Sequence, residues 1–369
     1  MMVKTKQNGK SNVMNILLVG PSPTAKGGIS SVLQNYLSYY NWKKSEILFL
    51  PTYIDGGKAK KILFFIKSLF QLNRILKINR IDIAHINMAK RGSFFRKEII
   101  AKKLMKHKIK IVLHHHAEFN EFYANLPELV KKRVCNLFDS IDVNIVLSEK
   151  IKSDMIQKFP KSNFDILYNA VPTCLENPYK HDSTVILFLG RLCERKGVYD
   201  LIKTIQRLHP EINPAYTFAL CGDGDCDKVS ALIDKLGLKD RIYHIGWIDN
   251  DQKKDILNKT VLHVLPSYSE GLPMSILETM SLGIPNISSN IAAIPEVISD
   301  GVNGFLIEPG NLDVLHDRIL YVLQNDKCRS TFSEKSYSLI YDDFSLTTHI
   351  EKLENIYTEV LKVSVENKQ

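Results

Sequence analysis

Two successive stretches of the chain alternate short apolar runs with longer amphipathic segments, and this alternation constrains the fold more than any other feature. The first stretch begins at the apolar run 15–19 and ends near Tyr168, and the second begins at Val185–Leu189. Strands that alternate with helices predict parallel sheets joined by crossover helices. We therefore expect an α/β fold of two Rossmann-like, doubly wound parallel-sheet domains facing across a cleft, with ligands beyond the carboxyl ends of the strands.

The segment between the two stretches is polar, carries Pro172 and Pro178, and shows no periodicity. A length of 369 residues also fits two domains, at about 150 residues each. The predicted boundaries are a polar N-terminal extension at 1–14, a first domain at 15–172, a linker at 173–183, a second domain at 184–346, and a C-terminal helix at 347–369 that packs back on the first domain.

Charge is distributed very unevenly over the two halves. The first 180 residues contain 30 Lys+Arg and 13 Asp+Glu, a formal net charge of +17, whereas the remainder contains 19 and 27, a net charge of −8. A basic half favours an anionic partner, either nucleic acid or a membrane surface. No recognition-helix pattern, zinc finger or RNA-binding aromatic signature is present, so we do not expect nucleic acid.

Two basic segments, Lys58–Arg80 and Phe94–Lys110, interleave cations with apolar residues. One interpretation is a solvated face over an ordinary core, and the other is peripheral docking on an anionic membrane surface. No apolar run approaches the ~20 residues of a spanning helix, the first residues do not form a secretory signal, and the cysteines form no C-x-x-C pair. We therefore expect a cytoplasmic chain, peripheral on the inner face of the plasma membrane if the docking interpretation holds.

The first motif with chemical content is G-R-L-C-E-R-K-G at 190–197, directly after a predicted strand. Arg191 and Lys196 are expected at the carboxyl end of the sheet, where a guanidinium fork and an ammonium can hold a diphosphate. A solvated turn between strand and helix is the alternative for this segment taken alone.

The second motif is P-S-Y-S-E-G-L-P-M-S-I-L-E at 266–278. Glu270 lies in its loop and Glu278 in the helix that follows, while Gly271 and Leu272 offer backbone N–H groups near the helix start. Two carboxylates repel a bare phosphate, so they are better suited to accept hydrogen bonds from sugar and ribose hydroxyls. A helix cap with an exposed acid is the weaker alternative.

Together these motifs resemble the family 4 retaining glycosyltransferases of GT-B fold. Further matches cover nearly the whole chain and are 27–29 (GGI), 169–171 (NAV), 222–224 (GDG), 246–248 (GWI) and 301–306 (GVNGFL). The stretch 85–97, with 117–123, is similar to bacterial surface-polysaccharide members. The resemblance implies an acceptor-side first domain and a second domain that binds a nucleotide-sugar donor, most simply a UDP-sugar.

The resemblance also implies a role for each matched residue. By this resemblance, Arg191 and Lys196 bind the donor diphosphate, and Gly27 and Gly28 let the backbone approach it. Glu278 holds the ribose, and Ile248 lies near the base. The transferring sugar is held by Glu270 together with the backbone of Gly271, Leu272 and Pro273.

The family's first-domain histidine, which contacts the donor sugar, is His115 or His116 in the run 114–116. An ungapped match gives His115, and a one-residue deletion gives His116. A metal site is not expected there, because successive residues at a strand end point to opposite faces. Asp223-Gly224-Asp225 favours a cap and turn over a metal loop, so we expect no metal and no other cofactor.

The expected reaction is transfer of a sugar, with retention of configuration, from a nucleotide-sugar to an acceptor hydroxyl on a glycan or lipid-linked acceptor, in capsular, exo- or lipopolysaccharide biosynthesis. Charge on the leaving diphosphate is stabilised by Arg191 and Lys196. The alternatives are a nucleotide-sugar epimerase or hydrolase of the same fold, and a non-catalytic basic membrane adaptor.

Overall fold

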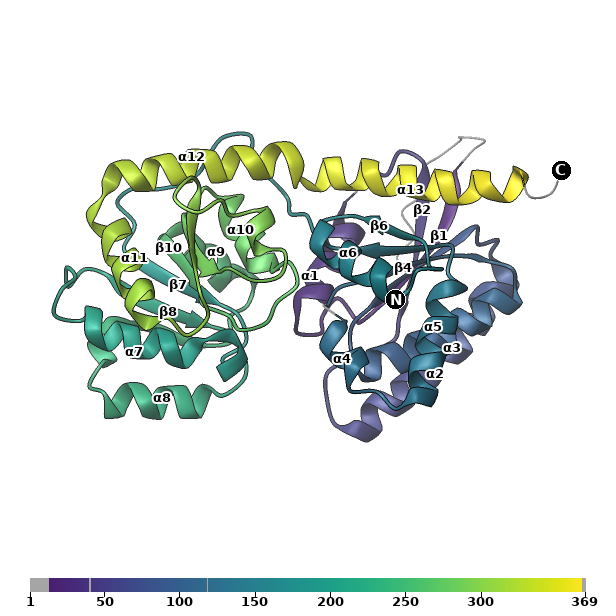
Figure 1. Ribbon diagram of the computed structural model, residues 1–369, viewed down its shortest axis with the longest axis horizontal. Coiled ribbons are helices and arrows are strands. Elements are labelled where there is room, and N and C mark those ends of the chain that lie inside the picture. The colour runs from purple at the N-terminus through teal and green to yellow at the C-terminus, as the bar shows by residue number, and fades with distance from the viewer. Residues whose placement is uncertain (1–12, 40, 118, 367–369) are drawn as a thin grey trace. The chain divides into compact units, whose positions relative to one another are not determined.

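The computed structural model describes residues 13–39, 41–117 and 119–366, and most of the predicted extension 1–14 lies outside them (Figure 1). The chain divides into two compact units. The first consists of Met1–Ala170 together with Leu346–Gln369, and the second of Val171–Ser345.

The first unit is built on a six-stranded parallel sheet in the order β2-β1-β3-β4-β5-β6. Its strands are β1 (Met14–Gly20), β2 (Ser45–Pro51), β3 (Ile83–Met88), β4 (Lys110–His115), β5 (Val143–Val146) and β6 (Phe164–Ile166). Its helices are α1 (Gly28–Ser38), α2 (Lys58–Ile78), α3 (Gly92–Lys106), α4 (Asn120–Ala124), α5 (Glu128–Asp139), α6 (Glu149–Lys158) and α13 (Leu346–Glu366).

Helices cover both faces of this sheet. The step from β1 to β2 runs opposite to the steps from β2 through β5, so right-handed crossovers place α1 on one face and α2, α3 and α5 on the other. These three helices lie side by side in Figure 1. His85 of β3 bonds the hydroxyl of Tyr357 in α13 at 2.6 Å, and Tyr36 of α1 bonds His349 of α13 at 2.6 Å. Helix α13 therefore packs on the same face as α1.

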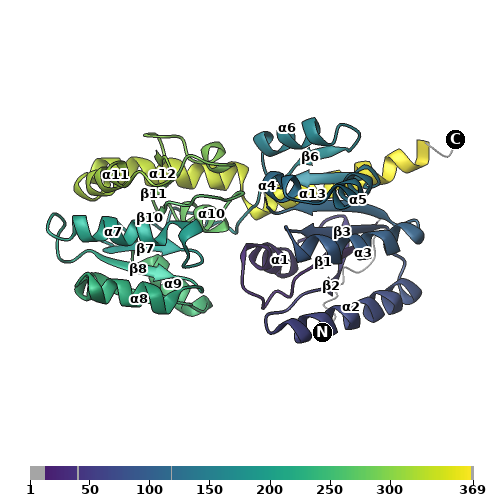
Figure 2. The same cartoon turned by 60° about the horizontal axis from the view of Figure 1, so that its bottom comes forward.

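The second unit is also built on a six-stranded parallel sheet, in the order β12-β11-β10-β7-β8-β9. The strands are β7 (Val185–Leu189), β8 (Thr217–Cys221), β9 (Ile242–Gly246), β10 (Thr260–Leu265), β11 (Asn286–Ser289) and β12 (Gly304–Ile307). The helices are α7 (Val198–Leu208), α8 (Cys226–Lys235), α9 (Asn250–Asn258), α10 (Met274–Met280), α11 (Leu312–Gln324) and α12 (Asp326–Asp343), with short 3-10 turns at Glu194–Lys196, Lys239–Arg241 and Ile294–Glu296. Figure 2 shows α11 and α12 beside the β11 end of this sheet and α8 and α9 beside the β8 end.

These two sheets confirm the α/β prediction. The segment predicted as a linker, 173–183, belongs to the second unit. Two of its side chains form hydrogen bonds with that unit: Asn177 donates to the Ser333 hydroxyl at 2.9 Å, and the Tyr179 hydroxyl donates to the Val261 carbonyl at 3.0 Å. Within the described residues no helix is both long and apolar enough to cross a membrane.

Candidate active site

The candidate site of the second unit lies at the point where the strand order reverses. Strands β7 and β10 are neighbours, and their connections leave in opposite directions along the sheet. In doubly wound sheets this switch point, beyond the carboxyl ends of the strands, is where ligands bind. Both predicted motifs begin here, since 190–197 follows β7 and 266–273 follows β10.

Glycines allow the loops at this edge to approach each other closely. Gly197 has φ +73°, and a Cβ on it would lie 2.0 Å from the Pro266 carbonyl oxygen. The amide of Tyr268 donates to the Arg195 carbonyl at 2.8 Å. A Cβ on Gly222, after β8, would lie 1.9 Å from the Gly190 oxygen. Only residues without a side chain fit at these positions.

The two loops are joined by an ion pair between Lys196 and Glu270. Their side chains are 15% and 7% exposed, so both charges are largely removed from water. The Ser267 hydroxyl donates to Glu270 Oε1 at 2.6 Å. The sequence interpretation gives Lys196 and Glu270 separate ligands, whereas in the structure each is the other's partner. The Glu270 carboxylate thus fixes the position of the Lys196 ammonium, and each of the two buried charges is balanced by the other.

Arg191 is the more accessible cation of this edge. Its side chain is 60% exposed, and its guanidinium lies 3.7 Å from the Asp223 carboxylate. At this exposure the ion pair is weak, so Arg191 can turn toward an incoming anion at little cost.

The second predicted carboxylate, Glu278, lies in α10 and accepts from the Lys253 ammonium of α9 at 2.6 Å. Both side chains remain partly exposed, at 19% and 28%. Residues Gly271, Leu272 and Pro273 lead into α10: the Gly271 carbonyl accepts from the Ala293 amide at 3.3 Å, and the Leu272 side chain is buried.

Ile248 lies just beyond β9, which ends at Gly246. Its side chain is buried in a hydrophobic cluster with Val185, Ala219 and Ile256, while the preceding Trp247 is 52% exposed. Any contact from Ile248 to a base must therefore come from its backbone.

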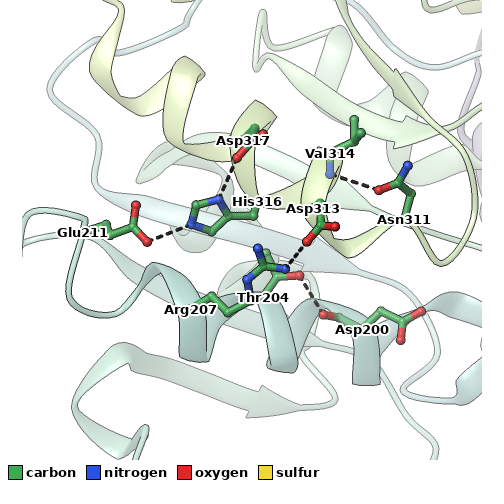
Figure 3. A network of polar contacts seen from close by, with 9 residues as sticks. All are labelled: Asp200, Thr204, Arg207, Glu211, Asn311, Asp313, Val314, His316 and Asp317. Carbon is green, nitrogen blue, oxygen red and sulfur yellow. Dashed lines mark hydrogen bonds and ion pairs between the residues drawn. The ribbon is translucent and has the colours of Figure 1, made fainter.

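A polar network connects α7 and the segment after it to α11 (Figure 3). Arg207 bonds Asp313 at 2.7 Å, and His316 bonds Glu211 at 3.1 Å and Asp317 at 2.9 Å. The same α7 supplies Asp200, whose carboxylate accepts from the Tyr268 hydroxyl in the β10 loop at 2.6 Å.

Sequence reasoning missed the residues that hold the predicted ones. Ser267 lies inside the quoted motif, and a hydroxyl three residues before Glu270 was the available signal. Lys253 and Asp200 carry no local signal, because their partners Glu278 and Tyr268 are distant in the chain.

The predicted residues of the first unit lie at the carboxyl edge of its own sheet. Gly27 has φ +126°, with open space where a Cβ would project, and Gly28 begins α1. This leaves the backbone at the start of α1 accessible.

The three histidines alternate between the two faces of the sheet. His114 and His116 share one face, with ring centroids 4.1 Å apart. His115 points to the opposite face, 4.9 Å from the Phe138 ring, and its Nε2 lies 3.1 Å from Asn144 Oδ1. His116 is half-buried at the strand end, with Nε2 2.7 Å from Asn87 Oδ1. The alternation argues against one ion held by all three.

Burial keeps these histidines neutral. It lowers the pKa of His115 to about 4, with the Asn144 hydrogen bond acting in the opposite direction. Burial, together with repulsion from His115 and His349 in their protonated forms, lowers the pKa of His116 to about 3. In the second unit, burial lowers the pKa of His263 to about 4.

Family models match the chain in two consecutive blocks. The model described as Glycosyltransferase Family 4 matches 41–174, and the one described as Glycosyl transferases group 1 matches 176–339.

Two bacterial proteins match most of the chain. An uncharacterized 41.2 kDa protein in the cps region of Klebsiella pneumoniae is 24% identical over 90% of this chain and 100% of its own length. The O-antigen biosynthesis glycosyltransferase WclY of Escherichia coli is 26% identical over 80% of this chain and 84% of its own.

Among solved structures, Anabaena Alr3699/HepE, crystallised in complex with UDP, has a TM-score of 0.72 and 18% identity, covering 94% of this chain and 100% of that one. The fold, the paired motifs at the switch point and the two family models agree, and the chain belongs to the GT-B glycosyltransferases of group 1 and family 4.

Proposed function

We propose that this glycosyltransferase moves a sugar from a nucleotide-sugar, most simply a UDP-sugar, to a hydroxyl of a glycan or lipid-linked acceptor with retention of configuration. The process served is capsular, exo- or lipopolysaccharide assembly, and no metal or other cofactor is required. The observation that carries the proposal is the Lys196–Glu270 ion pair, with Arg191 beside it, at the switch point of the second sheet.

In the proposed reaction the bond between the anomeric carbon and the diphosphate oxygen breaks while a bond to the acceptor oxygen forms on the same face. The acceptor proton passes to the leaving diphosphate. Arg191 and Lys196 stabilise the charge that develops there. Glu270 accepts from a hydroxyl of the transferring sugar, and Glu278 from the ribose.

Of the two candidate histidines, we assign the sugar contact to His116. His115 is 3% exposed and is enclosed by Phe138 and Asn144, whereas His116 is half-buried just beyond the last residue of β4. A neutral imidazole there can exchange its bond with Asn87 for one to a sugar hydroxyl.

The test is incubation with a panel of nucleotide-sugars and lipid-linked acceptors, followed by NMR of the product. We expect one donor to be consumed and its anomeric configuration to be kept. Absence of both donor turnover and donor binding contradicts the proposal, and an inverted product removes the retaining assignment. Release of free sugar without an acceptor supports the hydrolase alternative.

We also propose that α2 docks the chain on an anionic membrane surface. Helix α2 contains six Lys or Arg residues and no acid. Its outer face exposes large apolar side chains, namely Ile62, Leu63, Ile66 and Phe70 at 60%, 67%, 44% and 69%. An exposed apolar stripe flanked by cations is typical of a helix that lies in a lipid interface, where each cation adds about 1 kcal/mol.

Vesicle co-sedimentation tests this docking. Binding should require anionic lipid, weaken with salt, and fall in a variant with Leu63→Ser and Phe70→Ser. The matched control is Leu175→Ser with Val302→Ser, because these two apolar side chains are also exposed but lie in the second unit. Binding that is indifferent to lipid charge and salt defeats the proposal.

A further inference from the structure

The sheet of the first unit has its own switch point, between β1 and β3. In sheets of this order, as in doubly wound sheets generally, that point is where a ligand binds. The side chain of Lys97 in α3 reaches the carboxyl edge of this sheet, because its ammonium donates to the Thr52 hydroxyl. Thr52 follows β2, and its amide and hydroxyl both donate to the carbonyl of Gly20, the last residue of β1, at 2.8 and 2.9 Å.

Lys97 is a buried cation that has no carboxylate partner among the residues the structure describes. It is 2% exposed, and among the described residues the Thr52 hydroxyl is the only hydrogen-bond partner of its ammonium. The adjacent Glu98 is engaged by Lys102 at 2.7 Å and Arg133 at 2.5 Å. Burial and the neighbouring Arg96 charge hold the pKa of Lys97 well below its ordinary value. An ammonium so placed lacks the compensation that buried charges ordinarily have.

Two further cations gather around Tyr53, the residue after Thr52. The Arg96 guanidinium carbon lies 5.2 Å from the centre of the Tyr53 ring, and the Lys61 ammonium lies 5.2 Å from the same centre. Arg96 Nε is enclosed and has no hydrogen-bond partner in the described part of the chain. The carboxylate of Asp55 accepts from the Tyr53 hydroxyl at 3.3 Å and from the Lys26 amide at 2.8 Å.

We propose that Lys61, Arg96 and Lys97, here called the basic cluster, bind a phosphate or diphosphate group of the acceptor. The guanidinium of Arg96 supplies a bidentate fork and the two lysines supply point charges. A diphosphate compensates several cations at once, which a single carboxylate does not. This inference rests on the proposed glycosyl transfer, whose donor contacts in the second unit are separate residues.

The surroundings of the basic cluster indicate that the phosphate belongs to a lipid. Lys61 lies in the first turns of α2, and the exposed apolar stripe begins at the next residue, Ile62. A lipid whose diphosphate binds the basic cluster therefore has the exposed apolar face of α2 next to Lys61. The arrangement suits an acceptor held at a membrane by its own apolar chain.

Calorimetry on the full chain saturated with UDP tests the inference, since UDP occupies the donor contacts and leaves the basic cluster free. We expect inorganic pyrophosphate to bind, and Lys97→Met or Arg96→Gln to weaken it at least tenfold. The control Lys106→Met removes an exposed charge from the same helix and should have no effect.

The outcomes separate this inference from the proposed function. UDP affinity should be the same in Lys97→Met as in the unaltered chain, and a chain that binds no UDP counts against the proposed function only. Pyrophosphate binding that is absent, or unchanged by Lys97→Met and Arg96→Gln, overturns the basic cluster as a phosphate site. Farnesyl diphosphate should bind more tightly than pyrophosphate, and equal affinities overturn the lipid assignment.

Discussion

The cations at the carboxyl edges of the two sheets differ in the kind of partner they have. In the second unit Lys196 is paired with Glu270 and Lys253 with Glu278. In the first unit Lys97 has a hydroxyl as its partner, and Arg96 lies over an aromatic ring. Both edges lie at a switch point of a parallel sheet, so the difference is in the chemistry of the side chains.

This contrast separates a compensated site from an uncompensated one. A buried ion pair repays part of its desolvation by mutual attraction, and it holds both groups in a fixed geometry before a ligand arrives. For a buried ammonium without a carboxylate, the desolvation cost is not offset until an anionic ligand binds. The second edge is therefore preorganised, and the first gains its compensation on binding.

The two units should also differ in how much stability they lose at acidic pH, and this is the largest effect we expect. Burial lowers the pKa of His115, His116 and His349 of the first unit to about 4, 3 and 4, from 6.5. Below pH 6.5 these histidines bind protons in the unfolded chain but not in the folded unit. The free energy of unfolding is therefore highest above pH 6.5 and falls as the pH drops toward 4. At pH 5 the loss is about 2 kcal/mol for each histidine, roughly 6 kcal/mol for the three.

The two tryptophans of the chain report the units separately. Trp42 is buried in the first unit, and Trp247 lies in the second. Urea unfolding of the Trp42→Phe and Trp247→Phe variants, followed by fluorescence at pH 7.5 and 5, gives the stability of each unit. The first should lose several times more than the second, where burial lowers the pKa of His263. Equal losses contradict the comparison.

Removing the compensated cation should have the next largest effect. We expect Lys196→Ala to lower kcat/KM for the donor about 10²–10³-fold, because it removes charge stabilisation from the leaving diphosphate. Glu270 is also left buried without its cation, so activity must be expressed per folded molecule. Lys228→Ala, an exposed lysine of α8, is the control. A loss below tenfold shows that Lys196 serves the fold alone.

Much of the fold follows from the sequence because the strands are continuous apolar runs. Val185–Leu189 is predicted and observed with identical bounds. Helix α12 was not predicted, since its 18 residues bury Ser333 and Ser336 beside Phe332 and Ile340, which blurs the apolar period. In helix α5 the apolar period is also weak, because its buried residues form only a narrow stripe among charged residues, namely Val134, Leu137 and Phe138.

The sequence also contains both candidate motifs, but it does not predict that Lys196 and Glu270 form an ion pair. Lys196 and Glu270 are 74 residues apart, and no local pattern says that their side chains meet. The basic segments predicted a charged surface. That Lys97 is buried while Lys106 is exposed depends on which face of α3 meets the sheet, and this requires the tertiary structure.

The close approach of loops in the second unit is tested by two glycines of similar conformation. Gly197 and Gly237 have φ +73° and +68°, but a Cβ would meet the Pro266 oxygen at 2.0 Å in the first and open space in the second. Gly237→Ala should therefore cost about 1 kcal/mol of unfolding free energy for the backbone alone. Gly197→Ala should cost about 3 kcal/mol, since the steric conflict adds to it. Equal costs in urea unfolding show that the loops separate easily.

The smallest effect has the opposite sign and bears most directly on the comparison. If Lys97 is retained for a ligand, replacing it should stabilise the free protein, because a buried amine with one hydroxyl partner costs folding free energy. We expect Lys97→Met, which keeps an unbranched chain of similar length, to raise the free energy of unfolding by about 1 kcal/mol. Lys106→Met should leave it unchanged. A destabilised Lys97→Met shows instead that the bond to Thr52 is part of the fold, and the two edges then differ less than their charges suggest.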